Sequence, residues 1–171
     1  LEKPGLLQPS PEQPNAGQRR PADIYLPAWN GSPAALDFAI TSPHRMDAPP
    51  EARTSPGAAT TAYETYKRNF MNTAADCMAQ GIAFLPMVAE PTGGWGPSAL
   101  CTFKSFATAQ VAGSERCTSS VLASELQQLS TVLRRANARA VLCRTGDACC
   151  QPDTVVSDAA ALLAAGAEDA E

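Results

Sequence analysis

The side chains best suited to hydrolytic chemistry in this chain are two aspartates and one lysine. Asp23 and Asp37 lie fourteen residues apart on two β-prone segments, and Lys67 follows on a predicted helix. Metal-dependent cleavage of a phosphodiester needs two carboxylates that converge on one divalent ion, and a cation that stabilises the developing negative charge. Asp23, Asp37 and Lys67 are therefore the candidate catalytic residues, and the two aspartates are the candidate ligands of Mg²⁺ or Mn²⁺.

The two aspartates can share an ion only if they lie on one face of their sheet. The dipeptide Asn30-Gly31 between the β-prone segments predicts a hairpin. With a two-residue turn, Asp23 would pair with Phe38, and the aspartates would point to opposite faces because side chains alternate along a strand. A three-residue loop or a bulge would instead set Asp23 opposite Ala39 and bring both aspartates to one face. The metal site therefore requires an irregular hairpin.

Hydrophobic patterning predicts a small mixed sheet around this hairpin, whose strands are expected over 23–29 and 34–41. Apolar residues spaced by threes and fours predict a helix over 58–80, ended by the glycine that follows. The run 82–89 has no polar side chain, as expected for a strand covered on both faces, although Pro86 limits its hydrogen bonding. Strand, helix and strand together predict a right-handed β-α-β crossover with parallel strands.

Two further helices and two tails complete the predicted organisation. Apolar stripes predict helices over 97–112 and 119–142, both expected to pack on the sheet. Residues 1–18 are rich in proline and are expected to be a disordered tail, because such a composition buries too little apolar surface to offset the entropy of ordering. An α/β domain is thus expected over 19–144, followed by an acidic, Ala-rich tail over 145–171.

The formal net charge of -4 is unevenly distributed. Residues 145–171 hold six acids and no Lys or Arg, whereas residues 19–144 hold twelve Lys and Arg against nine Asp and Glu. A mildly basic core permits contact with the backbone of DNA or RNA. The expected contacts come from a basic stretch near the end of the last predicted helix: Arg134, Arg135, Arg139 and Arg144. The alternative for these arginines is a solvated helix end favoured by the helix dipole.

Cysteine and histidine usage gives little support for a structural zinc site. Six cysteines form no C-x-x-C pair, and His44 is the only histidine, so free thiols in a reducing compartment are expected. No apolar run approaches the roughly 18 residues needed to span a bilayer, which predicts a soluble, intracellular protein. A chain that begins at Leu1 rather than at Met is also expected to be part of a longer product.

A longer pattern around the two aspartates resembles a known family. Arg20-Pro21-Ala22-Asp23, followed by Leu36-Asp37-Phe38-Ala39-Ile40-Thr41, looks like the R/K-P-D…D/E signature of non-LTR retrotransposon endonucleases. The resemblance continues through Tyr63-Glu64-Thr65-Tyr66-Lys67-Arg68, where a lysine follows an aromatic residue, and through residues 81–90 to Gly93-Gly94-Trp95. It covers about 75 residues, and the order of its parts makes it moderately specific.

The resemblance implies a fold, an activity and a setting. The fold would be restriction-endonuclease-like, of the PD-(D/E)XK type, and the activity Mg²⁺-dependent nicking of a DNA strand for target-primed integration. The parent would be a retroelement polyprotein with an upstream reverse transcriptase, acting in the nucleus. The match also adds Arg20 to the residues expected to contact nucleic acid.

The chain departs from the family pattern at two positions. Ala22 separates Pro21 from Asp23, and Ala39 stands where the acid-x-Lys motif would put its lysine. Without a cation there, the site would lose electrostatic stabilisation of the reaction. Lys67 is the expected replacement, because it borders the buried face of the crossover helix and its long stem could reach the metal site.

Other interpretations of the same residues stay open. Asp23 could be a strand-edge acid that meets solvent or an arginine, and Lys67 a surface lysine on a solvated face shared with Glu64 and Arg68. Asp37 is more telling, because an acid within an apolar run is costly to bury without a partner. The chain could also be a degenerate copy that binds nucleic acid without cleaving it, or an unrelated small α/β interaction module.

Overall fold

The computed structural model describes residues 6–8, 19 and 21–145 of the chain. The elements follow in the order β1 (Ile24–Trp29), β2 (Ser32–Ile40), η2 (Pro50–Arg53), α1 (Ala58–Asn69), η3 (Phe70–Asn72), α2 (Thr73–Ala79), β3 (Ala83–Ala89), α3 (Pro97–Gln110) and α4 (Thr118–Thr145), where η denotes a short 3-10 helix. Apart from Thr145, the acidic tail expected over 145–171 lies outside the described residues.

The described sheet has three strands in the order β1-β2-β3. β1 runs antiparallel to β2, and β3 runs parallel to β2. The predicted hairpin and parallel crossover are therefore confirmed, and the chain is a mixed α/β protein. Pro86 lies in β3, an edge strand of this sheet, where a residue without a backbone N–H is tolerated.

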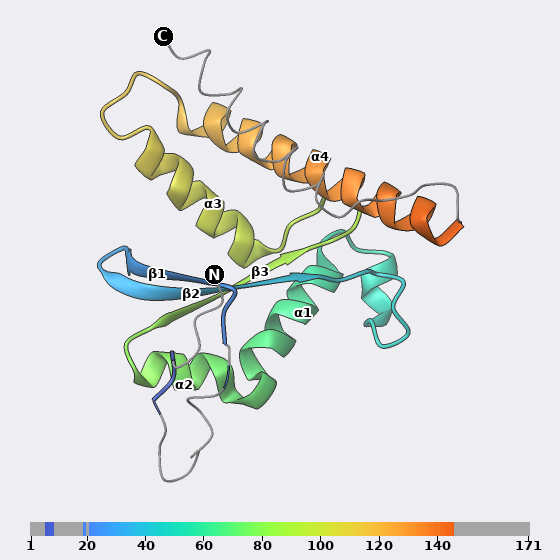
Figure 1. The fold of residues 1–171 in the computed structure, drawn as a ribbon, viewed down its shortest axis with the longest axis horizontal. Coiled ribbons are helices and arrows are strands. Elements are labelled where there is room, and N and C mark those ends of the chain that lie inside the picture. Colours follow the sequence, from blue (N-terminus) through green and yellow to red (C-terminus); the bar gives the residue numbers. More distant parts are fainter. Residues whose placement is uncertain (1–5, 9–18, 20, 146–171) are drawn as a thin grey trace.

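Helices cover both faces of the sheet, with α1 and α2 on one side and α3 and α4 on the other (Figure 1). Side chains alternate along β2, so neighbouring residues serve different cores. Ala35 packs in a cluster with Cys77 of α2, whereas Leu36 packs in a second cluster with Phe103 of α3. Odd-numbered residues of β2, which include Asp37, therefore belong to the face that α1 and α2 cover.

The hairpin turn is the two-residue turn that the sequence predicts. Asn30 has φ 46° and Gly31 has φ 88°, both in the left-handed region that a type I′ turn requires. Asparagine and glycine are the residues that enter this region at the lowest cost. Trp29 and Ser32 form the pair that closes the turn.

Beyond this turn, β1 contains a bulge. Leu26 pairs with Ala34, so two residues of β1, Pro27 and Ala28, lie opposite Pro33 alone. The extra residue falls where both strands carry a proline, which has no N–H to give to the ladder. The hairpin is thus irregular, and every pair beyond the bulge is shifted by one residue.

The helix predicted over 58–80 is interrupted, so the prediction of one continuous helix is wrong. α1 ends at Asn69, and Met71 (φ 51°) and Asn72 (φ 57°) are left-handed before α2 begins at Thr73. Asparagine tolerates this conformation because its short polar side chain can bond locally. Apolar residues keep a helical spacing across the break, so periodicity does not reveal it.

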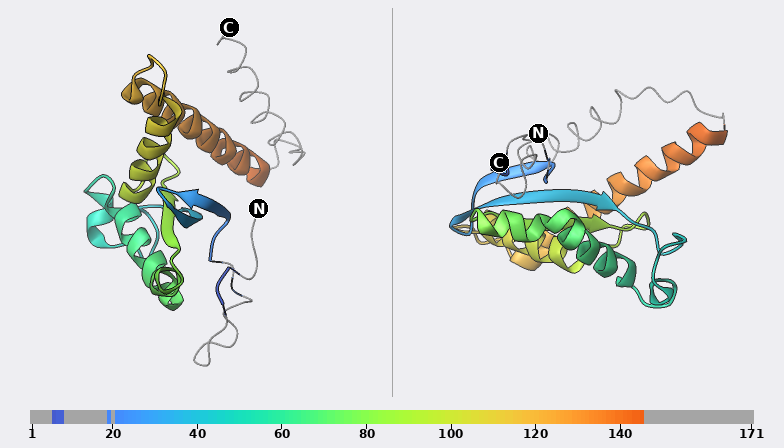
Figure 2. Two further views of the ribbon diagram at one scale, coloured as in Figure 1. Left: turned by 90° about the vertical axis from the view of Figure 1, so that its left-hand side faces the viewer. Right: turned by 90° about the horizontal axis from the view of Figure 1, so that it is seen from below.

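α3 packs on the sheet as predicted, whereas α4 packs mainly on α3. Leu122 and Leu126 near the start of α4 join the cluster beside α3. Leu129 is already 37% exposed and Val141 is 58% exposed, and Figure 2 shows the later part of α4 projecting beyond the sheet. None of the described helices is long and apolar enough to cross a membrane.

Two leucines within the tail expected over 1–18 pack in the core of the domain. Leu7 is completely buried and Leu6 nearly so. Both lie in the core cluster that holds Cys77 of α2 and Phe84 of β3. The prediction that this segment stands apart from the domain is therefore wrong for these residues, because the leucine pair completes the apolar layer beside α2.

We expect Leu7→Ala to lower the free energy of unfolding by about 2–5 kcal/mol, because it removes a fully buried side chain and leaves a cavity. Urea denaturation followed by circular dichroism measures the loss. Leu100→Ala is the matched control, since Leu100 on α3 is 41% exposed and its truncation should cost less than about 1 kcal/mol. Equal losses in the two variants would contradict the packing of Leu7.

Candidate active site

The bulge in β1 changes how the two aspartates are placed. Ile24 pairs with Leu36, so Asp23, the residue before Ile24, meets β2 near Asp37, and its charge acts on the Asp37 carboxyl. Strict alternation of side chains ends before Asp23, because its N–H bonds to the carbonyl of Leu36, which already pairs with Ile24, and because Ala22 packs in the same cluster as Tyr25. The hairpin is therefore irregular, as the metal site requires. The partner expected for Asp23 was Ala39, and this detail is wrong because the extra residue lies in β1 rather than in β2.

Asp23 is fixed by the backbone of the neighbouring strand. Its N–H donates to the carbonyl of Leu36 at 2.9 Å, and its Oδ2 accepts a hydrogen bond from the N–H of Phe38 at 2.7 Å. The side chain thus continues the β1–β2 ladder past the first residue of β1. Asp23 is not simply a solvated strand-edge acid, since a backbone donor sets its position.

Lys67 reaches this pair from α1. Its Nζ lies 2.8 Å from Oδ2 of Asp37, and the two side chains keep only 22% and 18% of their surface exposed. α1 covers one face of the sheet (Figure 1), so the cation that pairs with Asp37 comes from a helix and not from β2. Lys67 is therefore an ion-pair partner of Asp37 and not a surface lysine.

Burial raises the pKa of Asp37 above its ordinary value of 3.8. The hydrogen bond and the charge of Lys67 act in the opposite direction, and repulsion from the Asp23 carboxylate raises the pKa further. Asp37 is therefore a carboxylate that is costly to keep charged in the folded chain. Groups perturbed in this way are concentrated at functional sites.

The donor set at this position fits Mg²⁺. The residue of β3 that pairs with Asp37 is Pro86, which offers no further carboxylate. Among the residues that the structure describes, no three or more His, Cys, Asp or Glu side chains are grouped so that they could hold an ion. Mg²⁺ commonly takes one or two protein carboxylates and completes its shell with water and phosphate oxygens. Asp23 and Asp37 supply this number of carboxylates.

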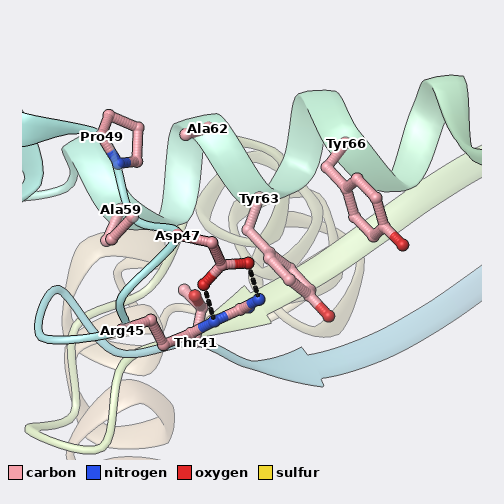
Figure 3. A pocket seen from close by; sticks show the side chains of 9 residues that line it. Thr41, Arg45, Asp47, Pro49, Ala59, Ala62, Tyr63 and Tyr66 are labelled. Carbon is pink, nitrogen blue, oxygen red and sulfur yellow. Dashed lines mark hydrogen bonds and ion pairs between the residues drawn. The ribbon is translucent and has the colours of Figure 1, made fainter.

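A second cluster, which sequence reasoning missed, surrounds a cavity of about 370 Å³ past the end of β2 (Figure 3). Arg45 forms a two-bond ion pair with Asp47, at 2.9 Å and 2.5 Å, and its guanidinium carbon lies 5.0 Å from the ring centre of Tyr63. Tyr66 also lines the cavity. Tyr66 and Phe70 belong to the apolar residues whose spacing predicts the helix over 58–80, yet each is about half exposed.

Glu64 was expected on a solvated face, and this is wrong because it is 94% buried, with 6% of its surface exposed. Its carboxylate accepts hydrogen bonds from the N–H of Ser98 at 3.0 Å and from the Ser98 hydroxyl at 2.9 Å. Arg68, one turn later on α1, donates to the same hydroxyl at 2.7 Å. A carboxylate at the N-terminus of α3 is favoured by the helix dipole. Glu64 and Arg68 therefore fix α1, and with it Lys67, against α3.

The arginines predicted to contact nucleic acid do not gather at the aspartates. Arg20 lies outside the described residues. The others are on α4, which packs with α3 on the other side of the sheet from Asp37: Arg134, Arg135, Arg139 and Arg144. Nε of Arg134 donates to the carbonyl of Thr92 at 3.1 Å, so this arginine helps to hold α4 against the loop after β3.

Within residues 6–8, 19 and 21–145, no group of three or more His, Cys, Asp or Glu side chains that could hold a metal ion includes a cysteine or His44. Burial raises the pKa of Cys77 to about 11, and Cys101 and Cys117 are exposed free thiols. Cys143 is disulfide-bonded, so the expectation of free thiols is wrong for this residue. His44 is exposed in the loop after β2.

The chain matches no protein-family model, no curated protein and no solved structure. A functional conclusion therefore rests on the positions and environments of these side chains, and above all on Asp23, Asp37 and Lys67.

We expect the stability difference between Asp37→Asn and the native chain to depend on pH. Because the pKa of Asp37 is raised on folding, the folded chain binds this proton more tightly than the unfolded chain. The contribution of Asp37 to stability therefore falls as the pH rises from the ordinary value of 3.8 through the raised one. Asp37→Asn lacks this titration, so its free energy of unfolding should rise relative to that of the native chain across that window.

Asp47→Asn provides a control of opposite sign. The hydrogen bond from Arg45 lowers the pKa of Asp47, so its contribution is present above the ordinary pKa and is lost as the pH falls through the lowered value. This variant should therefore lose stability relative to the native chain as the pH rises through that range. Urea denaturation in EDTA, from acid to neutral pH, measures both; slopes of the same sign would contradict the raised pKa of Asp37.

We expect Glu64→Ala to lower the free energy of unfolding by about 1–3 kcal/mol, because Ser98 would lose the buried acceptor of its N–H and its hydroxyl. Thermal or urea denaturation measures the change. Thr65→Ala is the neighbouring control on the exposed side of α1, and should stay within about 0.5 kcal/mol of the native chain. A Glu64→Ala variant as stable as the control would show that this carboxylate does not hold α1 against α3.

Proposed function

We propose that residues 19–144 form the core of a retroelement-derived, metal-dependent DNA endonuclease of the restriction-endonuclease-like, PD-(D/E)XK type, acting in the nucleus. One observation carries the proposal: Nζ of Lys67 lies 2.8 Å from Oδ2 of Asp37, and the charge of Asp23 also acts on the Asp37 carboxyl. These are the residue types that phosphodiester hydrolysis requires, gathered around one hairpin. Proteins rarely keep a partly buried aspartate pair without a role for it.

The chain path gives further support. A hairpin carries the two aspartates, and a helical connection leads to a strand parallel to the second hairpin strand. A right-handed crossover, the usual hand, would complete the proposed fold. The helix in this connection is the one that brings Lys67 over the aspartates, so the same crossover that builds the sheet also supplies the cation.

Each of the three side chains has a defined part in the proposed reaction. Asp23, fixed by the N–H of Phe38, and Asp37, fixed by Lys67, would hold Mg²⁺ between them. Bound Mg²⁺ supplies a Lewis acid for the phosphate and lowers the pKa of a coordinated water. The Lys67 ammonium, largely shielded from solvent, would stabilise negative charge on the phosphate oxygens, and such preorganised charge is a large contribution to catalysis.

A second candidate is a degenerate copy that binds DNA or RNA without cutting it. Ala39 favours this candidate, because the lysine of the acid-x-Lys motif is absent from its strand. The ion pair could also give Lys67 a purely structural role, in which it neutralises the charge of Asp37. An unrelated α/β interaction module is the third possibility, and the ion pair of Lys67 with Asp37, together with the charge of Asp23 on the same carboxyl, disfavours it.

We expect the purified chain to nick supercoiled plasmid DNA with Mg²⁺ or Mn²⁺, and EDTA to abolish nicking. Asp23→Asn and Asp37→Asn should each reduce nicking to background, because each removes one of two metal ligands. Lys67→Met should slow nicking by about 100-fold, the scale on which loss of one preorganised charge-stabilising group acts. Conversion of supercoiled to open-circular plasmid on gels gives the rates.

Lys104→Met is the matched control, because Lys104 is an exposed lysine on α3, on the other side of the sheet. It should nick at the native rate. Metal-dependent nicking that survives Asp37→Asn would point to a contaminating nuclease and contradict the assignment. Salt-sensitive binding without nicking would favour the degenerate copy.

A further inference from the structure

Three aromatic side chains of α1 and its C-terminal cap form a row along one side of the helix: Tyr63, Tyr66 and Phe70, here named the aromatic ladder. Ring centres lie 5.4 Å apart in both neighbouring pairs, and the ring planes are tilted by 38° and 39°. Tyr66 is 51% exposed and Phe70 is 50% exposed. Large aromatic side chains are usually mostly buried, so a row of half-exposed rings is a candidate binding surface.

The aromatic ladder adjoins the cavity past the end of β2. Tyr63 and Tyr66 line this cavity, and both rings project from the same side of α1 (Figure 3). The guanidinium of Arg45 lies 5.0 Å from the ring centre of Tyr63 and adds one more planar group to the row. Arginine planes and aromatic rings are the groups on which proteins stack unpaired bases.

The aromatic ladder also borders the candidate active site. Lys67, which pairs with Asp37, is four residues after Tyr63 and three before Phe70. Residues with these spacings are neighbours on a helix surface. A strand held at Asp37 would therefore have the rings of the ladder directly beside it.

We propose that the aromatic ladder stacks unpaired bases of the DNA strand held at the candidate active site. The inference deepens the proposed function and rests on it for the identity of the ligand. The cations beside the ladder are already paired, Arg45 with Asp47 and Lys67 with Asp37. They therefore give no net positive charge that would attract the phosphate backbone of a duplex, and binding must come from contact with the bases. Unpaired bases offer the flat faces that such rings bind, whereas a duplex hides them.

Fluorescence anisotropy with a labelled oligonucleotide of mixed sequence, in EDTA, tests this binding without cleavage. The full chain should bind the single strand more tightly than a duplex of the same sequence. The chain should also bind the ordinary single strand more tightly than it binds an abasic strand of equal length, which keeps the phosphates but lacks the bases. Tyr66→Ala should weaken single-strand binding by about 5- to 100-fold, and Tyr66→Trp should retain it.

Met78→Ala is the matched control, because Met78 on α2 is an apolar side chain that is 78% exposed and lies outside the aromatic ladder. It should bind as the native chain does. Phe70→Ala repeats the test at a second half-exposed ring, and circular dichroism identifies any variant that fails to fold.

Equal affinity for ordinary and abasic strands would overturn the inference. So would self-association that Tyr66→Ala abolishes while DNA binding is unchanged, because the aromatic ladder would then be a contact between copies of the chain. Base-dependent binding without Mg²⁺-dependent nicking would uphold the ladder and contradict the endonuclease. Mg²⁺-dependent nicking that Tyr66→Ala and Phe70→Ala leave unchanged, with no base-dependent binding, would uphold the endonuclease and contradict the role of the aromatic ladder.

Discussion

One extra residue in β1 is the constraint on which the candidate site depends. A regular hairpin around the turn at Asn30 and Gly31 would send Asp23 and Asp37 to opposite faces. The bulge opposite Pro33 shifts the pairing by one residue and moves Asp23 along β2 from Phe38 towards Asp37. The proposed metal site depends on this shift, because it brings the charge of Asp23 to bear on the carboxyl that Lys67 holds.

The candidate site also requires that α1 keep its position against α3, because α1 carries Lys67. Its polar contacts with α3 run through Glu64, Ser98 and Arg68, a buried network that is strong only while every member is satisfied. Gly96 belongs to the same arrangement, since a Cβ at this position would come within 2.1 Å of a Glu64 oxygen. The position of Lys67 is therefore maintained by a network that lies on the α3 side of α1.

Local signals in the sequence predicted the hairpin turn, β3 and α3, because a turn dipeptide, an apolar run and a helical stripe each act over a few residues. Three other features could not be predicted from local signals, because they depend on residues that are far apart in the sequence or on opposite strands. Which strand takes the bulge depends on how two prolines are accommodated across the hairpin. Burial of Glu64 depends on Ser98, thirty-four residues away, and burial of Leu7 depends on the space left beside α2. For the candidate site, residue types and their spacing singled out Asp23, Asp37 and Lys67 as candidates, but the ion pair between Lys67 and Asp37 and the burial of Asp37 depend on the assembled fold.

Pro27 and Pro86 have a consequence for how copies of the chain behave at high concentration. Each lies in an edge strand of the described sheet, and each lacks the N–H that an incoming strand would need. Free sheet edges invite pairing with another chain, and a proline placed there interrupts the template. Strand addition is thus disfavoured at both borders of the described sheet.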